Sequence, residues 1–275
     1  MTIAAIAPPA TADRGSTKQA WLRHRVAILR TVVVVLSVLL LEVASRLGWI
    51  EPVSFIPPSR MAASAWDILA TGKYNTDILL TLYAAGLAVM LAITFGFLFG
   101  VLLFKLPRVR RVLDPLLLSY YAVPIFVLYP MLIVLFGLNR WPLVALGFLF
   151  AVVAMAVNTL NGLERVPFVL LRTARMLRLG RAQEVRLITL PASLPYVFTG
   201  IKLAIVYSFI AVIGGEFVLS GAGFGYQIAY AYNNFDNPTM YGLMLLLLVF
   251  VGTLNLLLHA AEQRLYQRRV LTELT

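Results

Sequence analysis

Residues 78–104 read ILLTLYAAGLAVMLAITFGFLFGVLLF and contain no charged side chain. The hydrocarbon core of a bilayer is about 30 Å thick, so a helix that crosses it needs about 20 apolar residues. This stretch exceeds that length and predicts a membrane-spanning helix that tilts or projects beyond the bilayer.

The rest of the chain has the same character. Its 275 residues are 61% hydrophobic and 13% charged, with a mean hydropathy of +0.87. A soluble domain carries about a quarter charged residues, so a soluble enzyme, a disordered chain and a fibrous protein are excluded. We predict an all-α, polytopic membrane protein with about six transmembrane helices, over Val26–Val43, Ile78–Phe104, Pro115–Leu138, Pro142–Leu160, Tyr196–Leu219 and Met240–Ala261.

Basic residues are distributed unevenly between the predicted loops. The N-terminal tail through Arg30, the 105–111 loop, the 165–186 loop and the C-terminal tail carry 18 Lys and Arg residues, against four on the other side. Since cytoplasmic loops are enriched in Lys and Arg, both termini are predicted to be cytoplasmic. The net charge of +11 then reflects topology and contact with membrane lipid, and no nucleic-acid partner is expected.

The predicted spans divide the chain into four parts. Residues 1–25 form a cytoplasmic tail, and residues 26–75 hold the first span and a periplasmic segment. Residues 76–261 form the helical core, and residues 262–275 form a second cytoplasmic tail.

The first span is the least regular. Thr31–Leu41 is its uninterrupted apolar run, a length that also fits the core of a cleaved signal peptide. Glu42 and Arg46 stand four residues apart and are expected to pair on one face of a helix. Beyond them, Ser59–Leu69 is expected to form a short interfacial helix with Ser59 as its cap.

Side chains that perform chemistry do not cluster in this sequence. It has no cysteine, and its two histidines, His24 and His259, lie far apart, so no disulfide or metal site is expected. A GxxxxGK[ST] phosphate loop is absent, so no cofactor is expected in this chain. A membrane enzyme would need acids or histidines gathered at one face, whereas the 12 acidic residues are scattered.

The third span contains two prolines. Pro124 and Pro130 each remove a backbone donor, which predicts either a harmless kink between packed helices or a broken helix lining a pathway. Asp114–Pro115 is expected to begin this span as its cap and first helical residue.

Other polar features lie at the ends of the spans. Glu216 is the one acidic residue expected inside a span, and it should face the bundle interior or its outer mouth. It is expected either to accept a hydrogen bond from loop backbone or to line a pathway. Asn158 offers a smaller polar patch near the inner end of the fourth span. The glycine-rich run Gly221–Gly225 predicts a tight turn where helices approach closely.

The loop over residues 164–195 is longer than joining two helices requires. We predict one helix from Phe168 to about Ile188, ended by Pro191 and Pro195. Its arginines recur every third residue, so the basic stripe wraps around the helix. Such a helix suits either anionic lipid or a protein partner. The arginines are Arg172, Arg175, Arg178 and Arg181.

Residues 172–191, RTARMLRLGRAQEVRLITLP, resemble the cytoplasmic signature of permease subunits of type I ABC importers. That signature is EAA-xxx-G followed, nine residues later, by I-x-LP. The matching positions are Ala174, Ile188, Leu190 and Pro191. The departures are Arg172, Thr173 and Arg178, where Glu, Ala and Gly are usual, and Gly180, which lies two residues late.

Flanking residues strengthen the resemblance. LPASLPYVFTGIK, from Leu190 to Lys202, is similar to a stretch of the sulfonate, nitrate and taurine branch of that family. Glu216 stands where the branch has a Glu, and Gly221–Tyr226 is similar to its GxGLGY turn. The resemblance covers about residues 55–268.

The resemblance implies a type I ABC importer permease in the bacterial cytoplasmic membrane. Its implied partners are a second permease subunit, here expected to form a homodimer, two cytoplasmic ABC ATPase subunits carrying ATP and Mg, and an extracytoplasmic solute-binding protein. The 168–188 helix would be the coupling helix that docks on the ATPase. The residues implied in coupling are Arg172, Thr173, Ala174, Arg175, Leu177, Arg178, Gly180, Ile188, Leu190 and Pro191.

Two departures bear on the transported solute. Tyr121 and Ala84 stand where the branch often has Arg, and fixed positive charge would favour a sulfonate or nitrate. The solute is therefore either sulfonate-, nitrate- or taurine-like, as in the branch, or a neutral or aromatic molecule. The residues expected along the pathway are Tyr120, Tyr121, Pro124, Asn158 and Glu216.

An alternative function is the transmembrane coupling subunit of an energy-coupling-factor vitamin importer. Such subunits also send arginine-bearing cytoplasmic helices to ATPases, and Thr173–Arg175 is faintly similar to their motif. Their coupling helices come later in the chain, which favours the importer permease.

Overall fold

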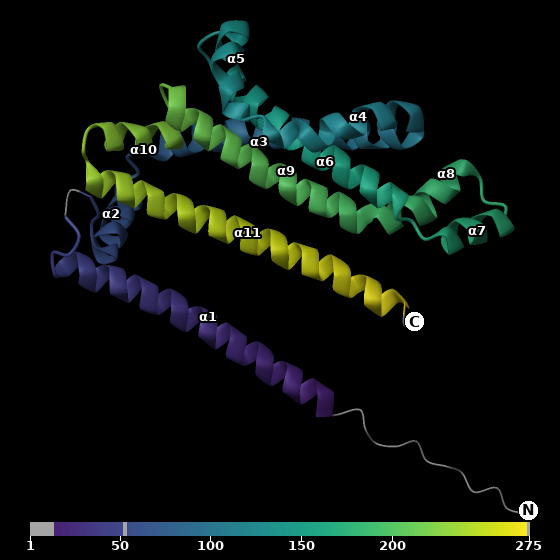
Figure 1. Ribbon diagram of the computed structural model, residues 1–275, viewed down its shortest axis with the longest axis horizontal. Helices are drawn as coiled ribbons and strands as arrows, with labels where there is room; N and C mark the ends of the chain where they lie inside the picture. The colour runs from purple at the N-terminus through teal and green to yellow at the C-terminus, as the bar shows by residue number, and fades with distance from the viewer. Residues whose placement is uncertain (1–13, 52–53, 274–275) are drawn as a thin grey trace, which may run out of the picture. The chain divides into compact units, whose positions relative to one another are not determined.

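The computed structural model describes residues 14–51 and 54–273, and every regular element in these ranges is helical (Figure 1). The elements are α1 Arg14–Arg46, α2 Pro58–Thr71, α3 Asn75–Lys105, α4 Pro107–Ser119, η1 Tyr120–Ala122, η2 Ile125–Leu128, α5 Tyr129–Phe136, α6 Trp141–Glu164, α7 Phe168–Met176, α8 Arg181–Glu184, η3 Val185–Thr189, α9 Leu190–Leu219, α10 Phe224–Asn233 and α11 Asn237–Glu273.

The chain forms two compact units, residues 1–63 and residues 64–275. Helix α1 belongs to the first unit and runs for 33 residues, with large apolar side chains exposed along it. The second unit contains the end of α2 and all of α3 to α11. Its buried side chains form the main core of the protein.

Helices α3, α6 and α9 make the centre of the second unit. Buried small residues recur at every fourth position along α3, which places them on one face of the helix. Faces of this kind let the backbones of membrane helices approach closely. The residues are Ala84, Ala88, Ala92, Gly96 and Gly100.

The glycines of this face meet α6 at very short range. A Cβ atom added at Gly96 would lie 2.7 Å from Met155 Cβ, and one at Gly100 would lie 2.6 Å from the carbonyl oxygen of Ala156. On α6 itself, a Cβ at Gly147 would lie 2.8 Å from Ala88 Cβ of α3. No larger residue fits at these three positions without moving a helix.

The described part of the chain confirms the all-α, polytopic fold with about six spans. Five helical stretches are long and apolar enough to cross a bilayer, and a bent pair provides the sixth. The five stretches are Ile28–Arg46, Asn75–Lys105, Trp141–Glu164, Arg181–Asn233 and Asn237–Gln263. The bent pair is Pro107–Ala122 with Ile125–Phe136.

The third span is a broken helix, which was one of the two forms that we expected for it. Helix α4 already begins at Pro107, so the expected helix start at Asp114–Pro115 is wrong, and Pro115 lies inside α4. The span then bends by 91°. Extended backbone at Val123 and Pro124 causes the bend. Pro130 lies in the first turn of α5, where a missing N–H is tolerated, so only Pro124 marks a break.

The loop before α9 is not the single helix expected over residues 168–188. Helix α7 ends at Met176, and Arg178 takes a φ of 52°, a left-handed conformation that an α-helix cannot continue through. The chain resumes as α8 and η3, which lead into α9. Pro191 and Pro195 lie within the first turns of α9, so they do not separate this loop from the span.

Candidate functional site

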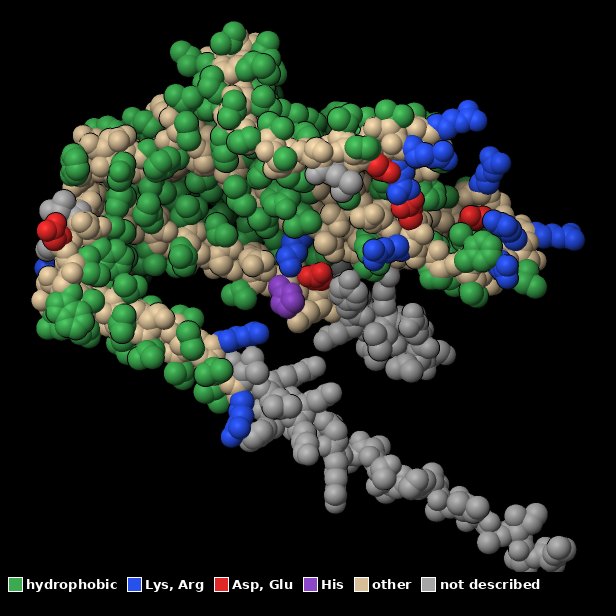
Figure 2. All heavy atoms as spheres, viewed as in Figure 1, with side chains coloured by type: hydrophobic (Ala, Val, Ile, Leu, Met, Phe, Trp, Pro, Cys, Tyr) green, Lys and Arg blue, Asp and Glu red, His purple; other side chains and the backbone are tan. Residues whose placement is uncertain are grey.

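The two basic loops of the second unit lie at the same end of it. Lys and Arg side chains gather there, over α4, α7 and α8 (Figure 2). Arg110 of α4 forms ion pairs with Asp114, at 3.4 Å, and with Glu164 at the end of α6. These pairs join the 105–111 loop to the start of the 165–186 loop.

Helix α7 presents apolar side chains at this basic end. Met176 is 85% exposed and Leu177 is 66% exposed, whereas Ala174 is fully buried. The Arg172 guanidinium lies 4.6 Å from the centre of the Phe168 ring, which is itself exposed. The outer face of α7 is therefore a mixed apolar and basic surface.

The residues implied in coupling fall into two groups. Six of them lie on α7 or in the turn that follows it, and Gly180 is the cap residue of α8. Ile188 lies in η3, and Leu190 and Pro191 begin α9. The structure therefore brings the first group to one helix and its end, with Ala174 turned inward. The α7 group consists of Arg172, Thr173, Ala174, Arg175, Leu177 and Arg178.

A cavity of about 500 Å³ opens beside α4, α6 and α9, near the basic end, and we call it the inner cavity. Tyr121 and Tyr207 line it with their rings 5.6 Å apart, and the Phe150 ring, which is not part of the lining, lies 5.7 Å from that of Tyr121. Asn158 and Asn161 add amide groups, of which the Asn158 amide donates to the Ala154 carbonyl at 2.8 Å. The other lining residues are Arg110, Asp114, Leu117, Ala154, Val157, Leu160 and Leu203.

Tyr120 and Pro124 occupy different surroundings from Tyr121. The Tyr120 hydroxyl donates to the Leu149 carbonyl at 2.8 Å, and its ring packs against a buried cluster around Leu146. Pro124 is exposed at the bend of the third span. Of the five residues expected along the pathway, only Tyr121 and Asn158 line this inner cavity.

Glu216 lies at the other end of α9, buried to 2% exposure. The Thr81 hydroxyl of α3 lies 2.8 Å from each carboxylate oxygen, and the Gly225 N–H donates to Oε2 at 2.9 Å. Thr81 Oγ1 in turn accepts the Phe224 N–H at 2.8 Å. The carboxylate thus holds the turn before α10 against α3 and α9.

Asp77 of α3 extends this hydrogen-bond network. It accepts the Gly223 N–H at 2.9 Å and the Gln227 side-chain amide at 3.0 Å. Gly223 has a φ of +108°, and a Cβ there would lie 2.4 Å from the Glu216 carboxyl carbon. Only glycine meets both conditions, which explains the glycine-rich turn.

Glu216 also lines a second cavity, of about 390 Å³, at the end of α9 away from the basic loops. We call it the outer cavity. Ala84, Tyr129 and Arg140 lie on the same cavity. The predicted pathway residues are therefore divided, because Tyr121 and Asn158 line the inner cavity and Glu216 the outer one. Within the described ranges, no three His, Cys, Asp or Glu side chains gather in a way that would hold a metal ion.

Several residues of these sites were not singled out from the sequence. Thr81 and Asp77 carry no local signal, because their partners lie more than 130 residues away. Tyr207 and Phe150 are ordinary apolar positions within long spans. The four-residue repeat of small side chains on α3 is a sequence signal for a helix-packing face, and our predictions did not include it.

The geometry defines a class of protein: a multi-pass helical membrane protein with its basic loops at one end and two cavities beside its central helices. Over residues 92–271 the chain matches the family described as binding-protein-dependent transport system inner membrane component, and it belongs to that family. It is a type I ABC importer permease.

Curated relatives agree with this assignment. The nitrate import permease protein NrtB of Leptolyngbya laminosa is 28% identical over 212 residues, covering 74% of this chain and 75% of that protein. The taurine transport system permease protein TauC of Escherichia coli K12 is 27% identical, covering 76% and 73%. The bicarbonate transport system permease protein CmpB of Synechococcus elongatus is 30% identical, covering 67% and 65%.

Solved structures support the fold. A chain of the MetNI methionine ABC transporter, in an inward-facing conformation, superposes with a TM-score of 0.62 at 16% identity, covering 71% of this chain and 97% of that chain. The family and these relatives give no support to the alternative of an energy-coupling-factor subunit.

Proposed function

We propose that this chain forms the pathway of an ATP-driven importer in the bacterial cytoplasmic membrane, as one of two identical permease subunits. Two ATPase subunits, which themselves carry ATP and Mg, dock at the basic end of the second unit. This end faces the cytoplasm. A solute-binding protein delivers the solute at the opposite end, and transport proceeds by alternating access.

The outer face of α7 is the observation that carries this proposal. Met176 and Leu177 are large apolar residues exposed outside the predicted spans, among arginines that disfavour burial in lipid. An exposed apolar patch with a polar rim is typical of a protein–protein contact. The position of α7 within the family signature supports an ATPase as the partner.

Co-purification tests the docking surface. Leu177→Asp places a charge on the exposed face of α7 and should reduce recovery of the ATPase with the tagged chain by about tenfold or more. Ala174→Asp is not suitable, because Ala174 is buried and its substitution would disturb folding. Phe235→Asp is the control, since Phe235 is also a large exposed apolar residue but follows α10. Full recovery of the ATPase with the Leu177 variant would overturn the docking assignment.

The inner cavity supports a neutral or aromatic solute. Its lining includes the rings of Tyr121 and Tyr207, and Arg110, the one cation among its described lining residues, is paired with Asp114 and Glu164. The inner cavity therefore offers little unpaired positive charge to bind an inorganic anion. Competitive uptake by the reconstituted complex tests this proposal, and preference for nitrate or bicarbonate over aromatic solutes would contradict it.

A further inference from the structure

A polar cavity of about 280 Å³ lies at the corner between α1 and α2, entirely within the first unit. It shares no lining residue with the inner and outer cavities of the second unit. We call it the corner cavity. Its lining residues are Ser45, Arg46, Phe55, Ile56, Pro57, Ser59 and Arg60.

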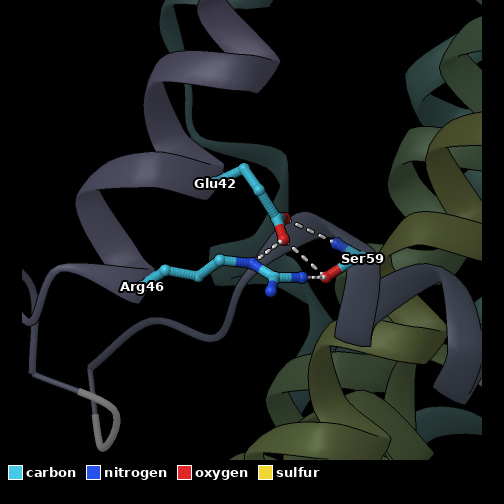
Figure 3. Close-up of polar contacts among 3 residues, drawn as sticks. All are labelled: Glu42, Arg46 and Ser59. Carbon is cyan, nitrogen blue, oxygen red and sulfur yellow. Dashed lines mark hydrogen bonds and ion pairs between the residues drawn. The ribbon is translucent and has the colours of Figure 1, made fainter.

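One side of the corner cavity is closed by contacts among Glu42, Arg46 and Ser59 (Figure 3). The Arg46 Nε donates to Glu42 Oε1 at 2.6 Å, and the Ser59 hydroxyl donates to the same oxygen at 2.7 Å. The Ser59 backbone N–H donates to Glu42 Oε2 at 2.9 Å. Glu42 of α1 thus caps α2, in place of the Ser59 cap expected from the sequence.

The other polar side chains of the corner cavity can donate hydrogen bonds that they do not make within the described residues. Ser45 Oγ is buried and has no hydrogen-bond partner among the described residues. Arg60 makes no ion pair within the described ranges. A buried polar atom without a partner calls for a ligand, water or an ion in the space beside it. The described lining residues include no carboxylate, and the Glu42 carboxylate beside them already accepts from Arg46 and Ser59, so a bound molecule can supply the missing acceptor.

The position of Arg60 points to binding rather than stability. Arg60 lies in the first turn of α2, where the positive end of the helix dipole disfavours a cation. Its guanidinium therefore destabilises the free helix slightly and is favourable only when an anion is near. Among the lining residues and Glu42, two positive charges on Arg46 and Arg60 face one negative charge.

The depth of the cavity identifies the source of the anion. The apolar stretch of α1 ends at Arg46, so the cavity lies where the headgroups of the bilayer begin. A phosphodiester carries one negative charge and accepts hydrogen bonds without donating any, and arginine binds it through paired N–H groups. We propose that the corner cavity binds the phosphodiester headgroup of a membrane phospholipid, through Arg60, Ser45 and the free N–H groups of Arg46.

Retention of lipid by the full chain tests the proposal. The purified protein is washed in detergent, and its bound phospholipid is measured by native mass spectrometry. Wild-type protein should retain a bound phospholipid. The double variant Arg60→Gln with Ser45→Ala should retain about tenfold less of it, because charge-assisted hydrogen bonds are lost. Arg60→Lys should restore part of the retention. Lys73→Gln, an exposed cation outside the cavity, should retain lipid as the wild type does.

Addition of ligands then separates the sources of phosphate. Phosphatidylglycerol should rebind to the washed wild type, and diacylglycerol, which has the same chains without phosphate, should not. Equal rebinding of diacylglycerol, or lipid retention by the double variant equal to that of the wild type, would overturn the site. Inorganic phosphate that displaces the lipid at low millimolar concentration would assign the cavity to a soluble anion and overturn the lipid assignment.

Discussion

Thr81 of α3 and Glu216 of α9 lie 135 residues apart in the sequence, and their side chains meet at 2.8 Å in the buried outer end of the bundle. Thr81 Oγ1 also accepts the Phe224 N–H. One hydroxyl therefore links two spans and the turn before α10. This arrangement makes the outer turn part of the bundle rather than a free loop.

Thr81→Val should destabilise the protein by about 1–3 kcal/mol, because the Phe224 N–H is left buried without an acceptor and Glu216 loses a donor. Thr159→Val is the matched control. Thr159 is equally buried, but its hydroxyl donates only to the Met155 carbonyl of its own helix. Thermal unfolding in detergent should show a lower transition for the Thr81 variant only.

Glu216→Gln should leave both stability and transport close to those of the wild type. The amide oxygen can still accept the Gly225 N–H, and the amide group can donate to Thr81 Oγ1. Unfolding and solute uptake are measured on the same preparation. Uptake that falls while stability is unchanged would show that the charge itself acts in the pathway.

Gly223→Ala should destabilise the outer turn by roughly 1–3 kcal/mol, since its φ of +108° strains any side chain and the Cβ would collide with Glu216. Gly221→Ala makes the same chemical change two residues earlier, where nothing lies within 4 Å. Hydrogen exchange of α10 should rise in the first variant and not in the second. Equal exchange in both would contradict the packing of this turn.

Arg178→Gly and Arg175→Gly should change stability in opposite directions. Arg178 has a φ of 52°, so glycine there relieves about 1–2 kcal/mol of backbone strain. Arg175 lies inside α7, where glycine costs about 1 kcal/mol. Both variants lose one positive charge, so charge alone cannot explain a difference between them. Thermal unfolding of the isolated permease provides the comparison.

Tyr121→Ala should reduce uptake of an aromatic solute by about tenfold, because one ring of the cavity wall is removed. Tyr121→Phe should retain uptake, since the ring remains and the hydroxyl only donates to the Phe150 carbonyl at 3.3 Å. Tyr83→Ala, at an exposed tyrosine of α3, controls for loss of an aromatic residue elsewhere. A similar decrease in the Tyr83 and Tyr121 variants would remove the cavity from the pathway.

The fold was predictable because segments inside the bilayer must be long and apolar, whereas the basic residues collect in the loops between them. The break at Pro124 was one of two interpretations that the sequence allowed, but Pro115 also lacks an N–H and lies within a helix, so proline alone does not place the bend. The end of α7 was not predicted, since arginine at position 178 does not itself favour a left-handed conformation. The usual Gly of the family signature at that position has its physical reason in this φ angle.

Side-chain partners were harder to predict than helices. Glu216 was recognised as a costly residue inside a span, and both a backbone hydrogen bond and a pathway position were considered for it. Its partner Thr81 was not found, because a threonine on an apolar helix has no periodicity that indicates its contact. The distribution of the predicted pathway residues over two cavities likewise depends on the bend in the third span.

The glycine contacts between α3 and α6 have a mechanical consequence. Because Gly100 faces the backbone of α6 with no room for even a methyl group, we expect the two helices to stay in register with each other. A Cβ at Gly147 of α6 would likewise lie 3.0 Å from Val212, so we expect α9 to move with these two helices. The hinge then falls at Val123 and Pro124, where the third span has extended backbone, and turnover should slow when that joint is stiffened.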